Sequence, residues 1–287
     1  MSMGAFFGRL WTTLTAHRIK LWIAAMIACT GLIASNVGNI GAPLGGAVYA
    51  GDASGGVSDF SDSQKKGIEA VVRSYLLKNP KILLEVEQEL KKIVAKEEAE
   101  QTRASIAKNA DFLFRRANAP IAGNPEGDVP VVEFFDYNCG YCKRSLGDIA
   151  GLIEKDPKVK VVFMEYPILS KGSLEASKVA LAARMQGKYW EVHRALLNHK
   201  SGGIDGKVAM KLAKEQGLDM GKLAKDVESA EVLDEIEKVQ EMAVSMDIHG
   251  TPHFLVGDRG IAGAPRDLLD QIRKNVSELR KDGCEVC

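Results

Sequence analysis

The sequence predicts an α/β protein in which a small sheet is interrupted by a helical insertion and preceded by an N-terminal helical arm. An apolar, strand-like run at 131–135 gives way to helical spacing of Leu146, Ile149 and Ile153. A second apolar run follows at 159–165. Strand, helix and strand in this order indicate a βαβ unit with two parallel, buried strands.

The rest of the chain supports the same class. Residues 118–130 are rich in proline and glycine and are predicted to form a loop. Helical apolar spacing dominates 173–247, and strand-like runs return at 253–256 and 260–262. A last helix is expected from about 265 to 281, so a helical insertion divides the strands into two groups.

Two cysteines with the spacing C-x-x-C, Cys139 and Cys142, stand where the first strand gives way to the helix. The free N–H groups and the positive end of the helix dipole stabilise a thiolate at that position. A thiolate is the form of cysteine that attacks disulfides. The motif therefore predicts a redox dithiol, with Cys139 as the nucleophile and Cys142 as the resolving thiol.

A zinc site is the structural alternative for this motif. Zinc needs four ligands, and a second C-x-x-C, Cys284 and Cys287, is present at the end of the chain. Zinc knuckles lie in tight turns, whereas Cys139 follows a strand and opens a helix. The context favours the redox interpretation.

Composition excludes one class of function. The 287 residues carry 38 basic and 38 acidic side chains, and 46% of them are hydrophobic, which is enough for a globular core. A balanced charge gives no sign of a nucleic-acid surface. The cysteines are too few for a structural disulfide framework, and no cofactor or metal is expected.

Residues 1–50 are interpreted as a targeting segment. Three basic residues precede the uncharged apolar run 21–34, which has the length of a signal-peptide core and is short for a membrane span. A small-residue site at 47–50 favours cleavage, an uncleaved anchor is the alternative, and Cys29 faintly resembles a lipidation site. Each reading places the remainder outside the cytoplasmic membrane, where dithiol enzymes work. Residues 51–60 form a predicted linker.

The segment 61–117 is predicted to be a helical arm. Ser61 and Gln64 form a capping box, and Asn79-Pro80 ends the first helix and starts the second with Asn79 as its N-cap. An apolar seam with spacings of three and four residues runs along the second helix at Leu83, Val86, Leu90 and Ile93. A pair of helices has little core of its own, so these faces must be buried on the catalytic domain or between chains.

The residues from Glu133 to Lys143, together with Gly250-Thr251-Pro252-His253-Phe254, resemble the thioredoxin superfamily, and more narrowly the bacterial DsbA-like proteins of the ScsC type. The resemblance covers roughly 61–282. It implies a thioredoxin fold at 118–283, with 284–287 left as a cysteine-containing tail. It also implies that the arm at 61–117 joins three chains into a homotrimer.

Glu133 lies in the apolar run six residues before Cys139. A carboxyl buried there would have a raised pKa and could accept the proton of the resolving thiol. The family carries a buried acid at the matching position, so the resemblance implies this role. The alternative is a glutamate at a strand edge that faces a cation.

The pair Thr251-Pro252 precedes a strand, where a cis X–Pro bond is a plausible turn device. The resemblance implies that Pro252 is cis and faces the dithiol, and that Thr251 contacts substrate. Tyr141, inside the motif, is expected to tune the redox potential and to contact substrate. His249 and His253 flank the loop and either tune the thiolate or are solvated.

The second C-x-x-C, at 284–287, follows a helix instead of opening one. A helix C-terminus raises the pKa of a thiol, so a disulfide or a metal-scavenging tail is expected there, not a second active site. The resemblance does not extend to this tail.

Three functions follow from these observations. The leading one is an envelope protein disulfide isomerase that acts through Cys139 and Cys142 on client proteins, with a membrane thiol reductase or oxidase as its electron partner. A monomeric DsbA-like oxidase is the alternative. A copper-binding protein that uses Cys139, Cys142, Cys284 and Cys287 is the alternative of another class.

Overall fold

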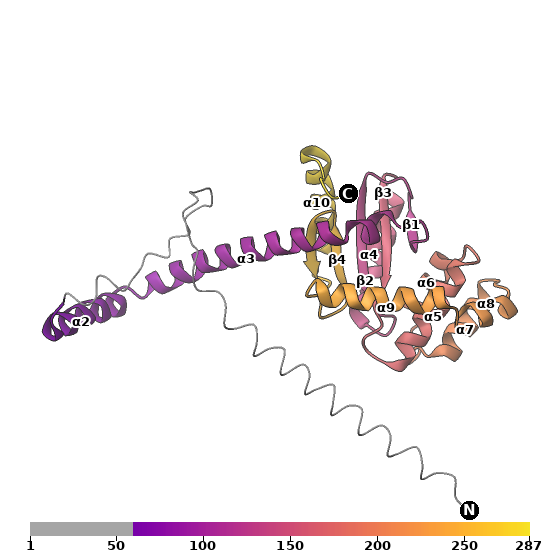
Figure 1. Ribbon diagram of the computed structural model, residues 1–287, viewed down its shortest axis with the longest axis horizontal. Coiled ribbons are helices and arrows are strands. Elements are labelled where there is room, and N and C mark those ends of the chain that lie inside the picture. The colour runs from indigo at the N-terminus through magenta and orange to yellow at the C-terminus, as the bar shows by residue number, and fades with distance from the viewer. Residues whose placement is uncertain (1–59) are drawn as a thin grey trace, which may run out of the picture. The chain divides into compact units, whose positions relative to one another are not determined.

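The computed structural model describes residues 60–287, and within them lies a five-stranded mixed sheet in the order β1-β3-β2-β4-β5. The strands are β1 (Ile121–Gly123), β2 (Val129–Phe135), β3 (Val159–Glu165), β4 (His253–Val256) and β5 (Arg259–Ala262). β2 and β3 are parallel, and every other neighbouring pair is antiparallel. The thioredoxin fold with its parallel βαβ unit is confirmed, and α4 (Gly140–Lys155) is the connecting helix (Figure 1).

The expectation of an unbroken loop at 118–130 was wrong. Its residues 121–123 form β1, an edge strand antiparallel to β3, and residues 129–130 already belong to β2. Three residues are too few for a readable alternation of apolar and polar side chains. Their pairing comes from β3, which offers a free edge, and local propensity did not show it.

The two faces of the sheet are covered by different helices. Val131 and Phe135 of β2 pack toward α4 and toward α5 (Lys171–Arg184), α6 (Tyr189–Leu197) and α10 (Leu268–Asp282). Val132 and Phe134 face the end of α3 (Lys81–Ala110) and helix α9 (Ala230–Ser245). Figure 1 shows α9 and the end of α3 crossing the same face of the sheet. β2 is buried on both faces along its whole length, so polar groups within it lie in the core.

The predicted helical insertion is helical, as short segments separated by turns. They are α5 (Lys171–Arg184), α6 (Tyr189–Leu197), α7 (Gly206–Glu215), α8 (Met220–Asp226) and α9 (Ala230–Ser245). The side chains of Ser170, Asp205, Asp219 and Ser229 cap the first N–H groups of α5, α7, α8 and α9. Gly217 ends α7 with a φ of 79°, a conformation that glycine adopts without strain.

The chain divides into two units at Tyr75, a position within α2 (Asp62–Lys78). In α2, Ser61 and Gln64 exchange the two hydrogen bonds of the predicted capping box. Helix α3 runs from Lys81 to Ala110, and Pro80 before it already has helical backbone angles (φ −62°, ψ −19°). The helical backbone therefore begins directly after Asn79, at the point where the sequence places the start of this helix.

The arm helix α3 differs along its length. Its seam is exposed: Leu83, Val86, Leu90 and Ile93 each keep more than half of their accessible surface. Its last turns are buried against the sheet and continue into a π-helical turn, Asp111–Arg115. The buried side chains are those of Ile106, Ala110, Leu113 and Phe114. The first part of α3 therefore does not pack on the domain, whereas the last part belongs to its core.

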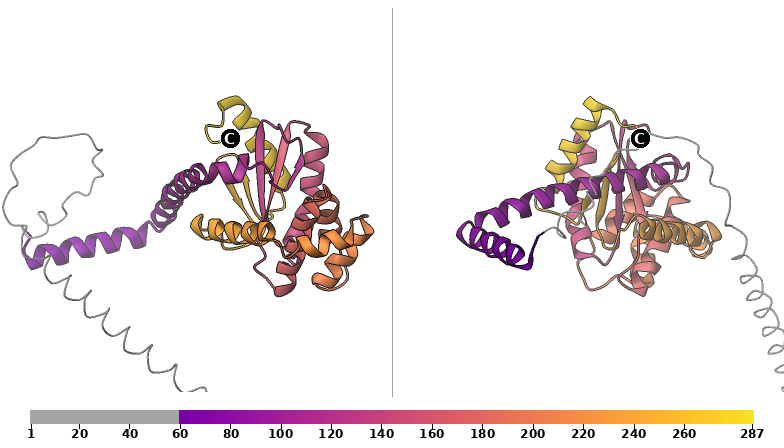
Figure 2. Two further views of the ribbon diagram at one scale, coloured as in Figure 1. Left: turned by 45° about the vertical axis from the view of Figure 1, so that its right-hand side comes forward. Right: turned by 60° about the vertical axis from the view of Figure 1, so that its left-hand side comes forward.

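Helix α10 (Leu268–Asp282) closes the domain on the α4 side, as Figure 2 shows from two further directions. The predicted signal segment 1–50 and linker residues 51–59 lie outside the described residues. Within residues 60–287, no helix combines the length and apolar character needed to cross a bilayer.

Candidate functional site

Cys139 lies at the junction between β2 and α4, as the sequence predicts. It is the N-cap residue of α4, with an extended backbone (φ −77°, ψ 120°). Its N–H donates to the carbonyl oxygen of Asp136 at 3.0 Å, and its own carbonyl accepts from Lys143 N–H at 3.1 Å. The sulfur is thus carried at the positive end of the helix.

The two thiols differ in exposure and in acidity. Both are free, but Cys139 keeps 7% of its surface and Cys142 none. A hydrogen bond from the Cys142 thiol is the main cause that lowers the pKa of Cys139 to about 5, and the side chain of Thr251 acts in the same direction. Burial raises the pKa of Cys142 far above its ordinary value. Near neutral pH the reactive thiolate is therefore Cys139.

The loop before β4 lies directly against this sulfur. The Thr251–Pro252 peptide bond is cis. In its protonated form, Cys139 Sγ can donate to the carbonyl oxygen of Thr251 at 3.2 Å. Pro252 is buried and Thr251 is partly exposed, so a chain that approaches Cys139 meets the backbone of Thr251.

Glu133 is buried in the centre of the sheet with 1% of its surface exposed. Its Oε1 accepts a hydrogen bond from Ser145 Oγ at 3.1 Å. Burial raises the pKa of Glu133 to about 8, with the bond from Ser145 acting against the shift and the Cys139 charge adding to it. The alternative of a strand-edge glutamate beside a cation was wrong, because β2 lies between β3 and β4.

Tyr141 is the exposed member of the motif, with 59% of its surface accessible. The guanidinium of Arg144 lies over its ring at 4.7 Å and also donates to the carbonyl oxygen of Ala264. The aromatic ring therefore stands next to the thiols on the solvent side, held by a cation–π contact.

Two side chains that sequence reasoning missed hold the loop in place. Asp136 is fully buried and accepts from the N–H groups of Asn138, Ile168 and Leu169 at 2.7–2.9 Å. Asn138 accepts from Ile204 N–H at 2.7 Å and donates back to Ile204 O at 3.0 Å. The turn before Cys139 is thereby tied to the helical insertion, a contact that local sequence does not reveal.

A second buried acid, Glu165, was also missed. Its Oε1 accepts from Tyr137 at 2.9 Å and from Tyr189 at 2.8 Å, and burial raises its pKa to about 8. The Tyr137 hydroxyl donates its one hydrogen to Glu165. In the 3.2 Å contact between that hydroxyl and His193 Nδ1, the hydroxyl oxygen must therefore accept and His193 must donate. Glu165 ends the apolar run 159–165, so the pattern that identified Glu133 could have identified it.

The histidines beside the cis-proline loop do not contact the dithiol. His249 is exposed and pairs with Asp247 Oδ1 at 2.7 Å. His253 pairs in register with Phe134 and so lies on the face of the sheet opposite to Glu133. Tuning of the Cys139 thiolate by either ring finds no support in this arrangement.

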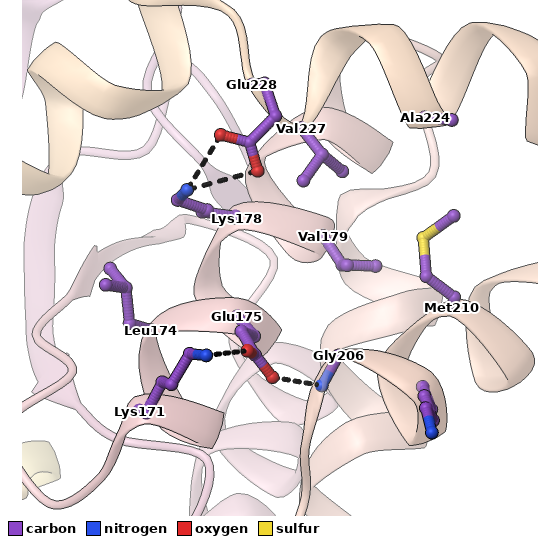
Figure 3. Close-up of a pocket in the computed structure, with 11 residues that line it drawn as sticks. Lys171, Leu174, Glu175, Lys178, Val179, Gly206, Met210, Ala224, Val227 and Glu228 are labelled. Carbon is purple, nitrogen blue, oxygen red and sulfur yellow. Dashed lines mark hydrogen bonds and ion pairs between the residues drawn. The ribbon is translucent and has the colours of Figure 1, made fainter.

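A groove of about 600 Å³ lies between α5, α7 and α8 of the insertion (Figure 3). Leu174, Val179 and Met210 contribute apolar side chains to it. Two ion pairs stand at its rim, Lys171 with Glu175 and Lys178 with Glu228. Glu175 also accepts from Gly206 N–H at 2.8 Å, which fixes the start of α7 beside α5.

Cys284 and Cys287 form a disulfide, one of the two expected outcomes for the tail. They lie at the start of β2, where Gly257 N–H donates to Pro130 O, whereas Cys139 lies at the end of β2. Among residues 60–287, no three side chains of His, Cys, Asp or Glu are placed to hold a metal ion. The four-cysteine copper site is not formed in this arrangement.

Two parts of the chain match known families. Residues 130–276 match the DSBA-like thioredoxin domain. Residues 64–97 match the N-terminal domain of the copper resistance protein ScsC.

Solved structures give the same picture. A thioredoxin-like oxidoreductase from Silicibacter pomeroyi is 44% identical, covers 60% of this chain and 97% of its own, and superposes with a TM-score of 0.57. The thiol-disulfide exchange protein alpha-DsbA2 from Wolbachia pipientis is 32% identical, and the match covers 63% of this chain and 97% of that protein, with a TM-score of 0.59. Proteus mirabilis ScsC in a transitional conformation is 26% identical, and the match covers 78% of this chain and 99% of that protein, with a TM-score of 0.57.

Among curated proteins, the chain is similar to part of the Na(+)/H(+) antiporter NhaA 1 of Mycolicibacterium gilvum. The two are 26% identical over 158 residues, which is 53% of this chain and 25% of the antiporter. The match thus spans a quarter of that protein, and its transport activity is not carried over to this chain.

Proposed function

We propose that this chain works as a protein disulfide isomerase. It belongs to the family of DSBA-like thioredoxin domains and is a thiol–disulfide oxidoreductase of the DsbA/ScsC type. The observation that carries the proposal is the pair of free thiols with opposite pKa shifts. Cys139 is acidic and partly accessible, whereas Cys142 is buried and holds its proton. Such a pair attacks a client disulfide readily and resolves the product slowly.

In the proposed reaction the Cys139 thiolate attacks one sulfur of a client disulfide. The client S–S bond breaks, a mixed disulfide forms and one client thiolate leaves. That thiolate can attack a second client disulfide, and a client thiolate finally displaces Cys139, so no net oxidation occurs. If instead Cys142 resolves the mixed disulfide, the client leaves reduced and Cys139–Cys142 becomes the disulfide.

Glu133 is the proposed acceptor for the Cys142 proton. Cys142 must ionise to resolve the mixed disulfide, and its buried position opposes that step. Ser145 holds the Glu133 carboxyl on the same side of the sheet as α4. A neutral-to-basic pKa makes this carboxyl a suitable base near pH 8.

Thr251, Pro252 and Tyr141 are the proposed client contacts. The Thr251 carbonyl lies 3.2 Å from the Cys139 sulfur, within reach of a client backbone that carries the attacked disulfide. Tyr141 offers an exposed ring on the solvent side of the thiols. Backbone contacts of this kind accept many client sequences.

We propose a homotrimer joined by the arm. The exposed apolar seam of α3 supports it, because such a surface on an isolated chain in water is unfavourable. The match of 64–97 to the ScsC N-terminal domain supports it as well. Several active sites around one client would let it be released from one and attacked by the next.

The proposed location is the periplasm or the outer face of the cytoplasmic membrane, reached through the N-terminal signal. The proposed partners are client proteins with disulfides and a membrane thiol reductase that returns Cys139 and Cys142 to the dithiol form. A cytosolic location would leave client disulfides scarce.

A DsbA-like oxidase is the second candidate, and the acidity of Cys139 favours it. A stabilised thiolate is a good leaving group, which makes the Cys139–Cys142 disulfide oxidising. Such an oxidase works as a monomer, and it requires a membrane oxidase as its partner.

One experiment separates the two candidates. Full-length mature protein is mixed with a scrambled, fully oxidised client and, separately, with the reduced client. An isomerase in the dithiol form restores activity to the scrambled client, and its mass in solution is that of three chains. A monomer that acts only on the reduced client contradicts the isomerase proposal.

A further inference from the structure

The tail disulfide Cys284–Cys287 packs on the turn between β4 and β5. A Cβ atom added to Gly257 would lie 3.0 Å from the Cys284 sulfur and 3.1 Å from the Cys287 sulfur. Gly257 has a φ of 54° and leaves no room for any side chain beneath the disulfide. The tail is therefore seated on the domain, and both of its cysteines remain partly exposed.

The same tail reaches the base of the arm. Arg115, in the π-helical turn that ends α3, donates to the carbonyl oxygen of Val286 at 3.0 Å. The Val286 side chain packs on the core cluster that contains Ile106, Leu113 and Phe114. One turn before that cluster, Arg103 of α3 pairs with Asp258 at 2.8 Å, beside Gly257. Tail and turn together hold the end of α3 against the sheet.

The tail sulfurs are out of reach of Cys139 in the same chain. Gly257 bonds to Pro130 at the start of β2, whereas Cys139 follows the end of β2. The five steps of strand from Pro130 to Phe135, at a rise of about 3.3 Å each, already span roughly 17 Å, and Cys139 lies beyond Phe135. Disulfide exchange needs sulfurs in contact, so the two pairs exchange electrons independently within one chain.

We propose that Cys284–Cys287 is a second thiol–disulfide site, which takes electrons from dithiol reductants and whose disulfide clamps the base of the arm to the sheet. A reductant thiolate attacks one tail sulfur, the Cys284–Cys287 bond breaks and a mixed disulfide forms. The second reductant thiol displaces the tail, which leaves with two thiols while the reductant becomes a disulfide. Without its ring, the tail loses the conformation that seats Val286, and the end of α3 opens more often.

The first test measures the two sites separately. Full-length protein is equilibrated in mixtures of reduced and oxidised dithiothreitol and alkylated, and peptides 139–142 and 284–287 are quantified by mass spectrometry. The tail is expected to change state with a midpoint of its own, which stays the same in the Cys139→Ala/Cys142→Ala variant. A tail that stays oxidised throughout, or a midpoint that moves in this variant, overturns the proposal.

The second test measures hydrogen exchange. Reduction of the tail, or the Cys284→Ser/Cys287→Ser variant, is expected to raise exchange in 103–116 and 255–262 by about threefold or more, with 136–144 unchanged. Val286→Asp with an intact disulfide is expected to do the same, because it removes the seated side chain. Glu285→Gln, an exposed change in the same tail, is the matched control and leaves exchange unaltered.

Two results of the exchange test contradict the clamp. Equal exchange at 103–116 in the oxidised and reduced tail means that the disulfide holds nothing. A rise over the whole domain means that the tail acts on global stability and not on the arm.

Discussion

Ser145 donates a hydrogen bond to Glu133 across the boundary between α4 and β2, at 3.1 Å. The same hydroxyl lies 3.0 Å from the carbonyl oxygen of Cys142, one turn earlier in the helix. Both side chains are buried, so this bond fixes a carboxyl beside the first turn of α4, where the resolving thiol lies. The chemistry proposed for Cys142 depends on this placement.

The first prediction concerns the two thiols. In reduced protein, thiolate absorbance is expected to rise with a midpoint near pH 5, because the bond from Cys142 stabilises the Cys139 anion. Rapid alkylation at neutral pH is expected to disappear in Cys139→Ala and to persist in Cys142→Ala. A fast-reacting thiol that survives in Cys139→Ala contradicts the assignment of the nucleophile.

The second prediction concerns Glu133→Gln. Resolution of a mixed disulfide is expected to slow about a hundredfold, because the acceptor for the Cys142 proton is lost, while attack by Cys139 stays nearly unchanged. Stopped-flow measurement of the two half-reactions with a fluorescent peptide disulfide checks this. Equal slowing of both half-reactions would remove Glu133 from the reaction.

Ser145→Ala is the matched variant for that prediction. Its hydroxyl favours the ionised carboxyl, so its loss raises the pKa of Glu133 further above about 8. The pH profile of resolution is then expected to move to higher pH, with the same maximum rate. A lower maximum at every pH would indicate a structural role for Ser145.

The third prediction concerns the boundary of the domain. A chain that starts near residue 100 keeps the buried residues Ile106, Leu113 and Phe114 and is expected to fold as a monomer. A chain that starts at residue 118 lacks them, and each contributes about 1.5–3 kcal/mol on burial. Denaturant unfolding is expected to show a loss of roughly 5 kcal/mol or more. Equal stability of both chains contradicts this account of the core.

The fourth prediction concerns the seam. Leu83→Glu/Leu90→Glu places two charges in the proposed contact between arms and is expected to convert the trimer into monomers. Glu87→Gln, an exposed change on the same helix, is the control. Light scattering gives the mass, and the scrambled-client assay is expected to fail only for the monomer. A trimeric double variant would exclude the seam as the contact.

The fifth prediction concerns Glu165 and pH. The pKa of Glu165 is about 8 in the folded protein, against an ordinary value of 4.5. Between pH 4.5 and pH 8 the folded state therefore keeps the carboxyl proton, whereas the unfolded state has lost it. Stability is then full below pH 4.5 and falls as pH rises toward 8, by up to about 1.4 kcal/mol per pH unit.

Glu165→Gln keeps an oxygen for both tyrosine hydroxyls and removes this dependence. The difference in unfolding free energy between variant and wild type is expected to move in favour of the variant from pH 5 to pH 8. Urea unfolding at both values gives the difference. A constant difference means that Glu165 does not titrate on unfolding.

The sequence alone determined the strand–dithiol–helix unit and the fold class. Strand 131–135, the C-x-x-C spacing and the helical period after Cys142 are local signals, and their physics acts over a few residues. The apolar setting of Glu133 is equally local. The disulfide or metal alternatives for Cys284 and Cys287 could be stated from spacing but not decided.

Only the tertiary structure decided which groups meet. Tyr137 contacts both Glu165, which lies 28 residues away in the chain, and His193, which lies 56 residues away. β1 forms because its backbone pairs with the edge of β3. The end of α3 enters the core because its apolar side chains bury the apolar face of the sheet opposite to Glu133. These contacts form between segments far apart in the chain, and no local pattern encodes a partner that distant.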